Sequence, residues 1–300
     1  MPVPRPAGWR PPDTMVWLWG LGAAALAAGM LLAVGGCSPL TALNAAVPDT
    51  GYDHHADIAY GEMPRRRLDV FVPHDLAGPA PVVMFLYGGS WKRGERRNYR
   101  FVAETLTGRG AVVVIPDYRL YPEARFPGFV EDAAAAVRWV HDNIERYGGD
   151  RDRLFLMGHS AGAHIAALVA LDDRYLAAVG LSPGVVRGLI GLAGPYAFDP
   201  SKYRSVRPVF ADAVAPDDVR PVTFADGDAP PTLLLHGGDD TTVYPVNSAE
   251  LARRINAAGG SARRIEYEDV GHVGILLALA RPFRGRAPVA DDAAAFIAGH

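Results

Sequence analysis

The chain has 300 residues, of which 49% are hydrophobic and 21% charged, as expected for a globular protein with a sizeable core. Its formal net charge of −3 leaves no basic footprint, so nucleic acid is not an expected partner. The only cysteine is Cys37, which excludes disulfides within the chain, a catalytic thiol in the folded domain and a metal site built from thiolates.

The amino terminus has the features of an export or anchoring segment. Arg5 and Arg10 precede an uncharged, Gly- and Ala-rich apolar run over residues 15–34, about long enough to span a bilayer. The run ends in Val34-Gly35-Gly36-Cys37, which resembles the bacterial lipoprotein box, with Cys37 as the residue that receives lipid. An uncleaved anchor helix is the alternative reading of the same segment.

Either reading predicts a domain that is exported and tethered to a membrane. Residues 1–37 would be the signal or anchor. Residues 38–51 contain two prolines and little periodicity, and are expected to form a linker. Residues 52–300 would form the folded domain.

The rest of the chain alternates between strand and helix patterns. In chain order, the expected elements are strands 56–60, 67–72 and 81–87, helix 98–107, strand 111–115, helix 126–147, a strand beginning at Arg153, helix 161–171, strands 188–193 and 232–235, helix 250–258, strand 264–267 and helix 293–297. This alternation predicts an α/β fold with a mainly parallel sheet covered by helices on both faces. The irregular stretch 197–229 is expected to form a small cap.

One strand–helix junction carries a nucleophile pattern. An apolar strand ends in Gly158-His159-Ser160-Ala161-Gly162, and an Ala-rich helix follows. Gly-x-Ser-x-Gly in this context predicts a nucleophile elbow, whose sharp turn needs small residues at Gly158 and Gly162. Ser160 is therefore the candidate nucleophile, and the amide of Ala161 is a candidate oxyanion donor. The alternative role for Ser160 is an ordinary helix cap.

A second Gly-x-Ser-x-Gly match lies at residues 180–184, around Ser182. Here proline follows the serine, and proline has no N–H to offer an oxyanion. No helical pattern follows Pro183 either. Ser182 is therefore interpreted as a loop residue.

A serine nucleophile needs a general base, which is expected to be His272. His272 follows the late strand 264–267, and loops after the strands of parallel α/β sheets carry catalytic residues. His164 is expected to pack on the elbow helix, and His159 is expected to point away from the nucleophile. The remaining histidines considered lie too early in the chain or at its end: His54, His55, His74 and His300.

The acid that orients the base is expected directly after strand 232–235, where Asp239 and Asp240 are adjacent. The order serine, aspartate, histidine along the chain is the order that α/β-hydrolases use. Weaker candidates for the acid are Glu266, Glu268 and Asp269.

The loop after strand 81–87 reads Gly88-Gly89-Ser90, and its backbone can approach a substrate closely enough to donate further hydrogen bonds to an oxyanion. Aromatic residues near these motifs are candidates for lining a substrate pocket. They are Trp91, Phe126, Tyr196 and Phe198.

Together these motifs resemble the α/β-hydrolase esterases related to the hormone-sensitive lipase and kynurenine formamidase groups. The matching stretches cover roughly residues 52–299: Gly88-Gly89-Ser90-Trp91, Asp117-Tyr118-Arg119-Leu120, Pro122-Glu123 with Phe126-Pro127, the elbow, Gly194-Pro195-Tyr196, His236-Gly237 with Asp240 and Val243, and Gly271-His272. The resemblance implies Ser160, Asp240 and His272 as a triad, with Gly89, Ser90 and Ala161 as oxyanion donors. One departure is Tyr87, which stands where that group usually has histidine.

The expected function is hydrolysis of carboxylic esters through an acyl-enzyme, without cofactor or metal, and the short cap suggests small or medium acyl groups. An amidase or formamidase, and a deacetylase of carbohydrate esters, are alternatives on the same scaffold. A catalytically silent binding module is the alternative from another class, although no triad member is missing. The membrane, through lipid or anchor helix, is the only other partner expected, and the sequence indicates no oligomeric state.

Overall fold

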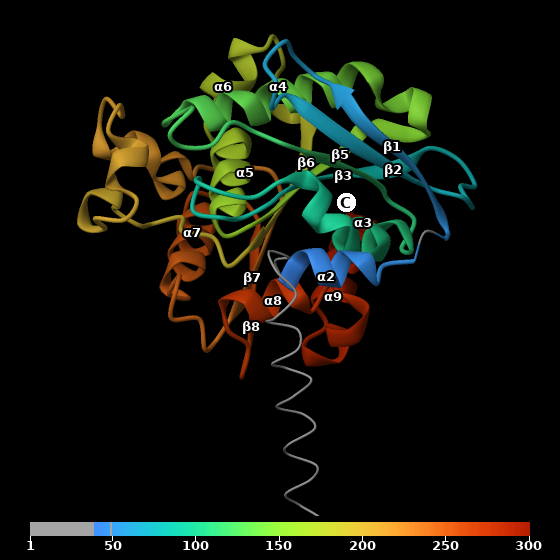
Figure 1. Cartoon of the computed structure of the whole chain (residues 1–300). Coiled ribbons are helices and arrows are strands. Elements are labelled where there is room, and N and C mark those ends of the chain that lie inside the picture. Colours follow the sequence, from blue (N-terminus) through green and yellow to red (C-terminus); the bar gives the residue numbers. More distant parts are fainter. Residues whose placement is uncertain (1–38, 49) are drawn as a thin grey trace, which may run out of the picture. The chain divides into compact units, whose positions relative to one another are not determined.

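An eight-stranded sheet in the order β1-β2-β4-β3-β5-β6-β7-β8 organises the fold (Figure 1). This computed structural model describes residues 39–48 and 50–300. The first two pairs, β1 with β2 and β2 with β4, are antiparallel, and all later pairs are parallel. The strands are β1 (Tyr52–Ala59), β2 (Arg67–Pro73), β3 (Ala80–Leu86), β4 (Val112–Pro116), β5 (Gly149–His159), β6 (Val186–Leu192), β7 (Thr232–Gly237) and β8 (Ala262–Tyr267). The predicted α/β class with a mainly parallel sheet is confirmed.

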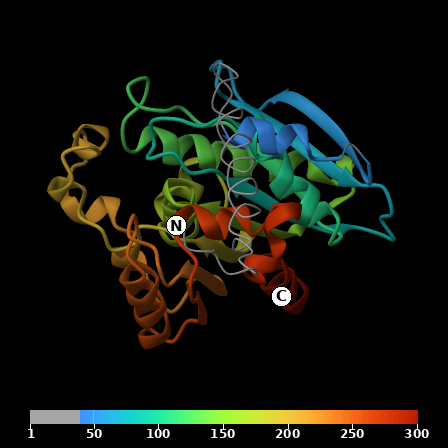
Figure 2. The ribbon, with the colours of Figure 1, turned by 60° about the horizontal axis from the view of Figure 1, so that its bottom comes forward.

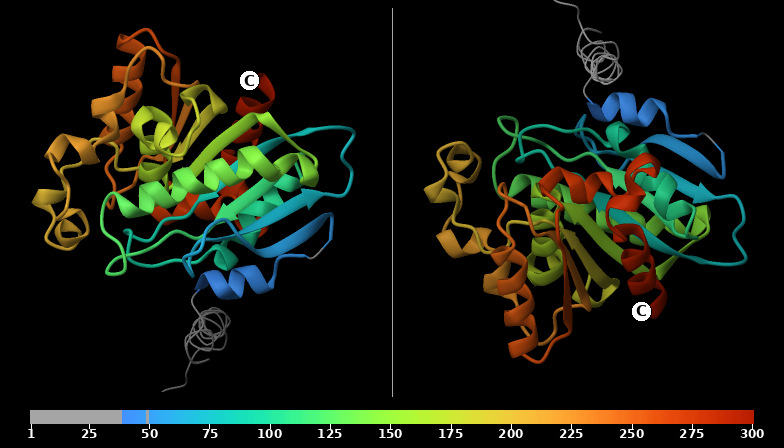
Figure 3. Two further views of the ribbon diagram at one scale, coloured as in Figure 1. Left: turned by 90° about the horizontal axis from the view of Figure 1, so that it is seen from above. Right: turned by 90° about the horizontal axis from the view of Figure 1, so that it is seen from below.

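Helices cover both faces of the sheet (Figure 3). α4 (Gly128–Asn143) and α5 (Ala161–Leu171) lie on one face, and α3 (Arg100–Thr107) and α9 (Val289–Gly299) lie on the other. Every residue of α5 is buried, because α4, the sheet and the chain after β6 pack around it. A helix that is apolar all round is expected in such a position. The other α-helices in the described part of the chain are α2 (Pro39–Ala45), α6 (Asp173–Ala178), α7 (Val246–Ala257) and α8 (His272–Leu277).

The expected cap, residues 197–229, has no α-helix or strand (Figure 2). It is built from four short 3-10 helices, and each has a proline in its first two positions, where the missing N–H costs nothing. They are η4 (Pro200–Lys202), η5 (Arg207–Phe210), η6 (Pro216–Val219) and η7 (Pro221–Phe224). The imidazole of His164 on α5 donates to the carbonyl of Val219 at 2.7 Å, which fixes this stretch over the helix.

The expected linker, 38–51, differs from expectation because part of it forms α2. The Asn44 amide donates to the carbonyl oxygen of Arg97 at 2.6 Å, and its Oδ1 accepts the N–H of Phe101 at 3.2 Å. Asn44 thereby satisfies an N–H in the first turn of α3, a contact that local periodicity does not reveal. Residues 1–37, including Cys37, lie outside the described residues. Within the described ranges, no helix has the length and apolar character needed to cross a membrane.

Candidate active site

The strand–helix junction at Ser160 has the strained geometry of a nucleophile elbow. Ser160 lies between β5 and α5 with φ 55° and ψ −121°, a conformation that costs energy for a residue with a side chain. Its N–H donates to the carbonyl oxygen of Leu192 on β6 at 2.9 Å, which holds the turn in place. A β-carbon on Gly162 would collide with the carbonyl oxygen of Leu86, and one on Gly158 with the carbonyl oxygen of Gly162. The two glycines therefore permit a turn that no larger residue could make.

Three side chains from distant parts of the chain meet at this turn. The Nε2 atom of His272, at the start of α8, lies 2.9 Å from Ser160 Oγ. Its Nδ1 atom lies 2.7 Å from Oδ2 of Asp240, in the loop after β7. An ionised carboxylate only accepts, so Nδ1 carries the proton and Nε2 is free to accept from the hydroxyl of Ser160. The predicted serine, base and acid thus form one hydrogen-bonded chain.

Asp240 is held in its ionised form. Burial alone would raise its pKa, but hydrogen bonds from His236, His272 and the amide of Val243 outweigh burial and keep the pKa well below its usual range. Its Oδ1 accepts the N–H groups of Thr242 at 2.9 Å and Val243 at 2.8 Å. The carboxylate is therefore fixed and charged, as the partner of an imidazolium must be.

Between the two adjacent aspartates, the structure places Asp240 against His272. Asp240 is 2% exposed. Asp239 is exposed to solvent, and its hydrogen bond to the carbonyl oxygen of Val270, at 3.1 Å, is made by its main-chain N–H. Glu266, Glu268 and Asp269 make no hydrogen bond or ion pair to His272 within the described part of the chain.

The loop after β3, the candidate oxyanion loop, has an unusual backbone conformation. Gly89, Ser90 and Trp91 all have positive φ, at 133°, 55° and 58°. Only glycine fits the first position, because a β-carbon there would strike the main chain of Arg93. In the described ranges, the amides of Gly89, Ser90 and Ala161 have no hydrogen-bond acceptor. Of the three residues, Ser90 and Ala161 line the same cavity as Ser160.

Tyr87, the departure from the usual histidine, anchors this loop. Its buried hydroxyl donates to Asp117 Oδ1 at 2.7 Å and accepts from Arg65 at 3.0 Å. Its carbonyl oxygen accepts the hydroxyl of Tyr118 at 2.6 Å. Its ring lies against the Cα of Gly94, at the far end of the loop. Tyr87 therefore contacts both ends of the candidate oxyanion loop.

A buried arginine extends these contacts to the edge of the sheet. Arg96 is 9% exposed and donates to Asp117 at 2.5 Å, to Asp69 at 2.7 Å and to Asp57 at 2.6 Å. Asp69 lies on β2, and Asp57 lies at a bulge in β1. One guanidinium thus connects the β1–β2 hairpin, through Asp117, to Tyr87 and the oxyanion loop.

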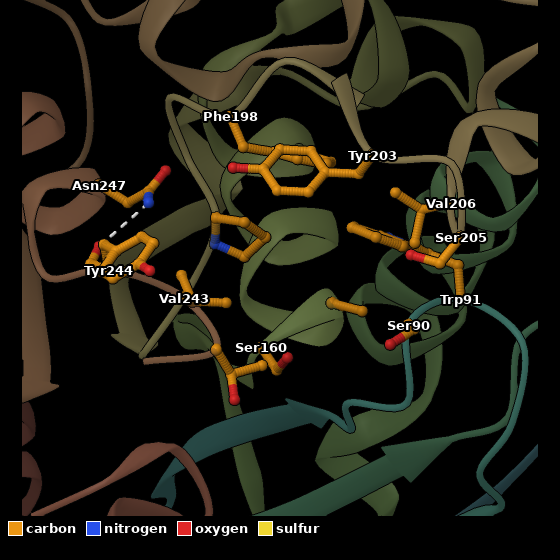
Figure 4. A pocket seen from close by; sticks show the side chains of 13 residues that line it. Ser90, Trp91, Ser160, Phe198, Tyr203, Ser205, Val206, Val243, Tyr244 and Asn247 are labelled. Atoms are coloured by element: carbon orange, nitrogen blue, oxygen red, sulfur yellow. Dashed lines mark hydrogen bonds between the residues drawn. The ribbon is translucent and has the colours of Figure 1, made fainter. Parts of the chain in front are cut away.

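A cavity of about 180 Å³ opens beside Ser160 (Figure 4). None of the residues that line it is charged. Trp91 forms part of its wall, with its ring stacked on Phe198 at a centroid distance of 5.5 Å. The lining residues are Ser90, Trp91, Ser160, Ala161, Pro195, Phe198, Tyr203, Ser205, Val206, Thr242, Val243, Tyr244 and Asn247.

Two of the four aromatic residues predicted for the pocket are elsewhere. Phe126 packs in an aromatic cluster with Phe129 and Phe210, at centroid distances of 6.2 and 5.9 Å. Tyr196 is fully buried, with its ring against the backbone of Gly194. Both belong to the core, because an aromatic residue near a motif in sequence can point either into a pocket or into packing. The prediction of these two as pocket residues is corrected.

Comparison with known families agrees with this architecture. The model of the prolyl oligopeptidase family matches residues 128–282, more than half of the chain. The chain belongs to the prolyl oligopeptidase family. A second family model, BD-FAE, matches residues 68–178 and so covers the oxyanion loop and the elbow. The resemblance to α/β-hydrolase esterases expected from the motifs is confirmed.

The curated relatives of the chain include esterases from plants and bacteria. The chain is 32% identical over 250 residues to the probable isoprenylcysteine α-carbonyl methylesterase ICME of Oryza sativa subsp. japonica, a match that covers 76% of this chain and 59% of that protein. It is 30% identical over 241 residues to esterase LipC of Mycobacterium tuberculosis, covering 74% and 60%. The chain thus spans about three fifths of the length of these curated relatives.

Solved esterase structures share the fold. Esterase B from Lactobacillus rhamnosis superposes with a TM-score of 0.74 over 96% of both chains, at 20% identity. A truncated carbohydrate esterase from gut microbiota gives a TM-score of 0.67 over 84% of this chain and 98% of its own, also at 20% identity. At such low identity the likeness concerns the fold alone.

Two histidines of this esterase-family site have contacts that the sequence did not predict. His236 lies buried beside Asp240, with Nε2 at 3.3 Å from Oδ2 and 2.8 Å from the carbonyl oxygen of Val243. His159 is expected from the sequence to point away from the nucleophile, but its ring lies 4.9 Å from that of His272. Both histidines lie in motifs that the sequence shows. The contact of His159 could not be predicted from it, because its partner His272 lies 113 positions further along the chain.

Proposed function

We propose that this protein hydrolyses small, uncharged carboxylic esters through an acyl-enzyme formed on Ser160. The observation that carries the proposal is the unbroken hydrogen-bonded chain from Asp240 through His272 to Ser160, which ends beside the cavity. The match to esterase families supports ester hydrolysis as the reaction class.

In the first half of the reaction, Ser160 Oγ attacks the ester carbonyl carbon while His272 Nε2 takes the hydroxyl proton. Negative charge develops on the carbonyl oxygen, where the free amides of Gly89, Ser90 and Ala161 stabilise it. Each such donor contributes about 10²- to 10³-fold in rate. Collapse of the tetrahedral intermediate breaks the bond to the alcohol, and His272 gives its proton to the leaving oxygen.

In the second half, water replaces the alcohol. His272 takes a proton from the water, the hydroxide attacks the acyl carbon, and the bond to Ser160 Oγ breaks as the proton returns to the serine. Asp240 remains ionised throughout and stabilises the imidazolium that forms in each half. These steps need no group beyond the chain's own residues and water.

The uncharged cavity supports preference for neutral esters. A charged acyl group would leave water for a lining without an opposite charge, which is unfavourable. Stacked Trp91 and Phe198 offer apolar contact, and the volume of about 180 Å³ suits a short acyl group. Serine, threonine and tyrosine hydroxyls in the lining are uncharged polar partners for the alcohol or the acyl chain.

Labelling with a fluorophosphonate tests the proposal. We expect one probe per chain, found on Ser160 by peptide mass spectrometry, and none on Ser182, which has the same Gly-x-Ser-x-Gly spacing without the elbow. Hydrolysis of p-nitrophenyl acetate should exceed that of p-nitroacetanilide and of acetylated sugars, and p-nitrophenyl butyrate should exceed the charged p-nitrophenyl hemisuccinate. Absence of labelling would favour a silent binding module, and preference for the anilide or the sugar acetate would favour the amidase or the deacetylase.

The tether expected from the sequence is a separate part of the proposal. We propose that the apolar run and Cys37 attach the domain to a membrane outside the cytoplasm, with lipid on Cys37. Expression in a bacterial host fed radiolabelled palmitate should give a labelled chain, and Cys37→Ser should abolish the label. An equally labelled Cys37→Ser chain would contradict lipidation, whereas an unlabelled wild-type chain in the membrane fraction would favour the anchor helix.

A further inference from the structure

The proposed base, His272, lies in the segment that follows β8, the strand at one edge of the sheet. Two strands, β6 and β7, separate the central β5, which carries the elbow, from the edge strand β8. Neighbouring strands are about 4.8 Å apart, so the chain leaving β8 must reach back over about 14 Å to place His272 beside Ser160. His272 begins α8, a helix of 6 residues. So short an element has little rigidity of its own.

His159 joins this segment to the centre of the sheet. Its Nε2–H donates to the main-chain carbonyl oxygen of His272 at 2.9 Å, across 113 positions of sequence. The two rings lie 4.9 Å apart at an angle of 41°. Within the described residues, this bond and the bond between His272 and Ser160 are the hydrogen bonds that connect the elbow to the segment carrying the base.

The hydrogen bond from His159 to the carbonyl oxygen of His272, called the tie, is not affected by protonation near neutral pH. His159 is 5% exposed, and burial, reinforced by the neighbouring His272, lowers the pKa of its imidazole to about 3. A neutral imidazole has a single N–H, and a carbonyl oxygen can only accept, so the proton resides on Nε2. His159 therefore donates to His272 at every pH at which the enzyme would operate.

We propose that His159 is a positioning residue that holds the main chain of His272 over Ser160, and that deacylation depends on it more than acylation does. This inference rests on the proposed ester hydrolysis. In the free enzyme the Ser160 hydroxyl also donates to His272 and helps to hold it. In the acyl-enzyme Ser160 Oγ is esterified and has no proton to donate, so the tie from His159 is what remains between elbow and base. That is the stage at which His272 must orient a water molecule.

The kinetic signature follows from the two-step reaction. If His159→Leu slows deacylation about 10- to 100-fold, as misplacement of a catalytic group does, the acyl-enzyme accumulates. Both kcat and KM then fall together, whereas kcat/KM, which reports acylation, stays within about threefold of wild type. General loss of structure would instead lower kcat and kcat/KM together and leave KM unchanged.

The experiment is stopped-flow hydrolysis of p-nitrophenyl acetate by the full chain. We expect His159→Leu to give a burst of p-nitrophenol approaching one per active site, followed by slow turnover. His159→Gln, whose side-chain amide can place an N–H near the position of Nε2, should restore kcat to within about threefold. His164→Leu is the matched control, because it removes a buried histidine bond of 2.7 Å, to Val219 O, without touching His272. It should give no larger burst than wild type.

Equal kcat and KM in His159→Leu and wild type would overturn the inference, as would a parallel fall of kcat and kcat/KM. If His159→Leu does not fold, His159→Asn replaces it in the test. Asparagine keeps a polar side chain, but its amide is too short to reach the carbonyl oxygen of His272. A burst in His159→Asn but not in His159→Gln supports the proposed role of His159. The absence of a burst from both variants overturns that role. Failure of the wild type to hydrolyse any ester would instead contradict the proposed function itself.

Discussion

Replacing Asp240 by asparagine is expected to lower kcat by about 10⁴-fold, whereas Asp239→Asn should remain within about twofold of wild type. Asp240 Oδ2 accepts Nδ1–H of His272 at 2.7 Å, which leaves Nε2 unprotonated toward Ser160. An asparagine in its place can present an N–H to Nδ1 and so favour the opposite tautomer, which cannot take the serine proton. Asp239 faces solvent, and within the described residues its side chain makes no hydrogen bond or ion pair to the imidazole.

The pair of variants is a matched test, because the two positions are adjacent and the change is the same. Steady-state hydrolysis of p-nitrophenyl acetate gives kcat, and circular dichroism checks that both variants fold. A large loss in Asp239→Asn alone would overturn the assignment of Asp240. A loss of similar size in both would indicate damage to the loop rather than loss of the acid.

Lowering the pH from 7.5 to 5 is expected to reduce the free energy of unfolding by about 4 kcal/mol, from two buried histidines. Burial lowers the pKa of His159 to about 3 and that of His164 to about 4, against an ordinary value near 6.5 in the unfolded chain. Between these limits the unfolded state binds more protons than the folded state, so stability falls as pH falls. Each histidine contributes about 1.4 kcal/mol per pH unit below 6.5.

Thermal melts of the full chain at pH 7.5 and pH 5 measure this effect, with an expected fall in Tm of roughly 10 °C. In His164→Gln or His159→Gln the difference between the two pH values should be about half as large. Asp240 and Asp69 have lowered pKa values, so their stabilisation is complete above about pH 4 and does not contribute between pH 5 and 7.5. A pH-independent Tm over this range would contradict the neutral burial of both imidazoles.

Much of the fold could be predicted because its elements follow local rules. Apolar runs such as 81–87 and 188–193 coincide with strands, and the amphipathic segment 126–147 contains α4 followed by a 3-10 turn. Short elements such as α6 and α8 were missed, because six residues are too few to establish a helical period. The helix α2 in the expected linker depends on Asn44 meeting α3, which is a tertiary contact.

The residues of the candidate site were likewise predicted where a local motif marks them and missed where their position depends on tertiary packing. Ser160, His272 and the two aspartates were predicted because each lies in a motif directly after a strand, where the fold brings loops together. Of the cavity wall, Trp91 and Phe198 were predicted. Tyr203, Tyr244 and Asn247 were not, because no motif marks them and their position beside Ser160 depends on tertiary packing. Phe126 and Tyr196 were assigned to the pocket on proximity in sequence, which does not determine the direction of a side chain.

The buried side chain of Arg96 links the amino-terminal hairpin to the oxyanion loop. Both family matches begin after β1, at residues 68 and 128, yet Asp57 at the bulge in β1 shares a guanidinium with Asp69 and with Asp117, the partner of Tyr87. A chain trimmed to residues 68–282, the combined span of the two matches, would keep Ser160, Asp240 and His272. It would nevertheless leave Arg96 short of a carboxylate and deprive the oxyanion loop of its outermost support. Residues that precede both family-model matches therefore take part in supporting the oxyanion loop.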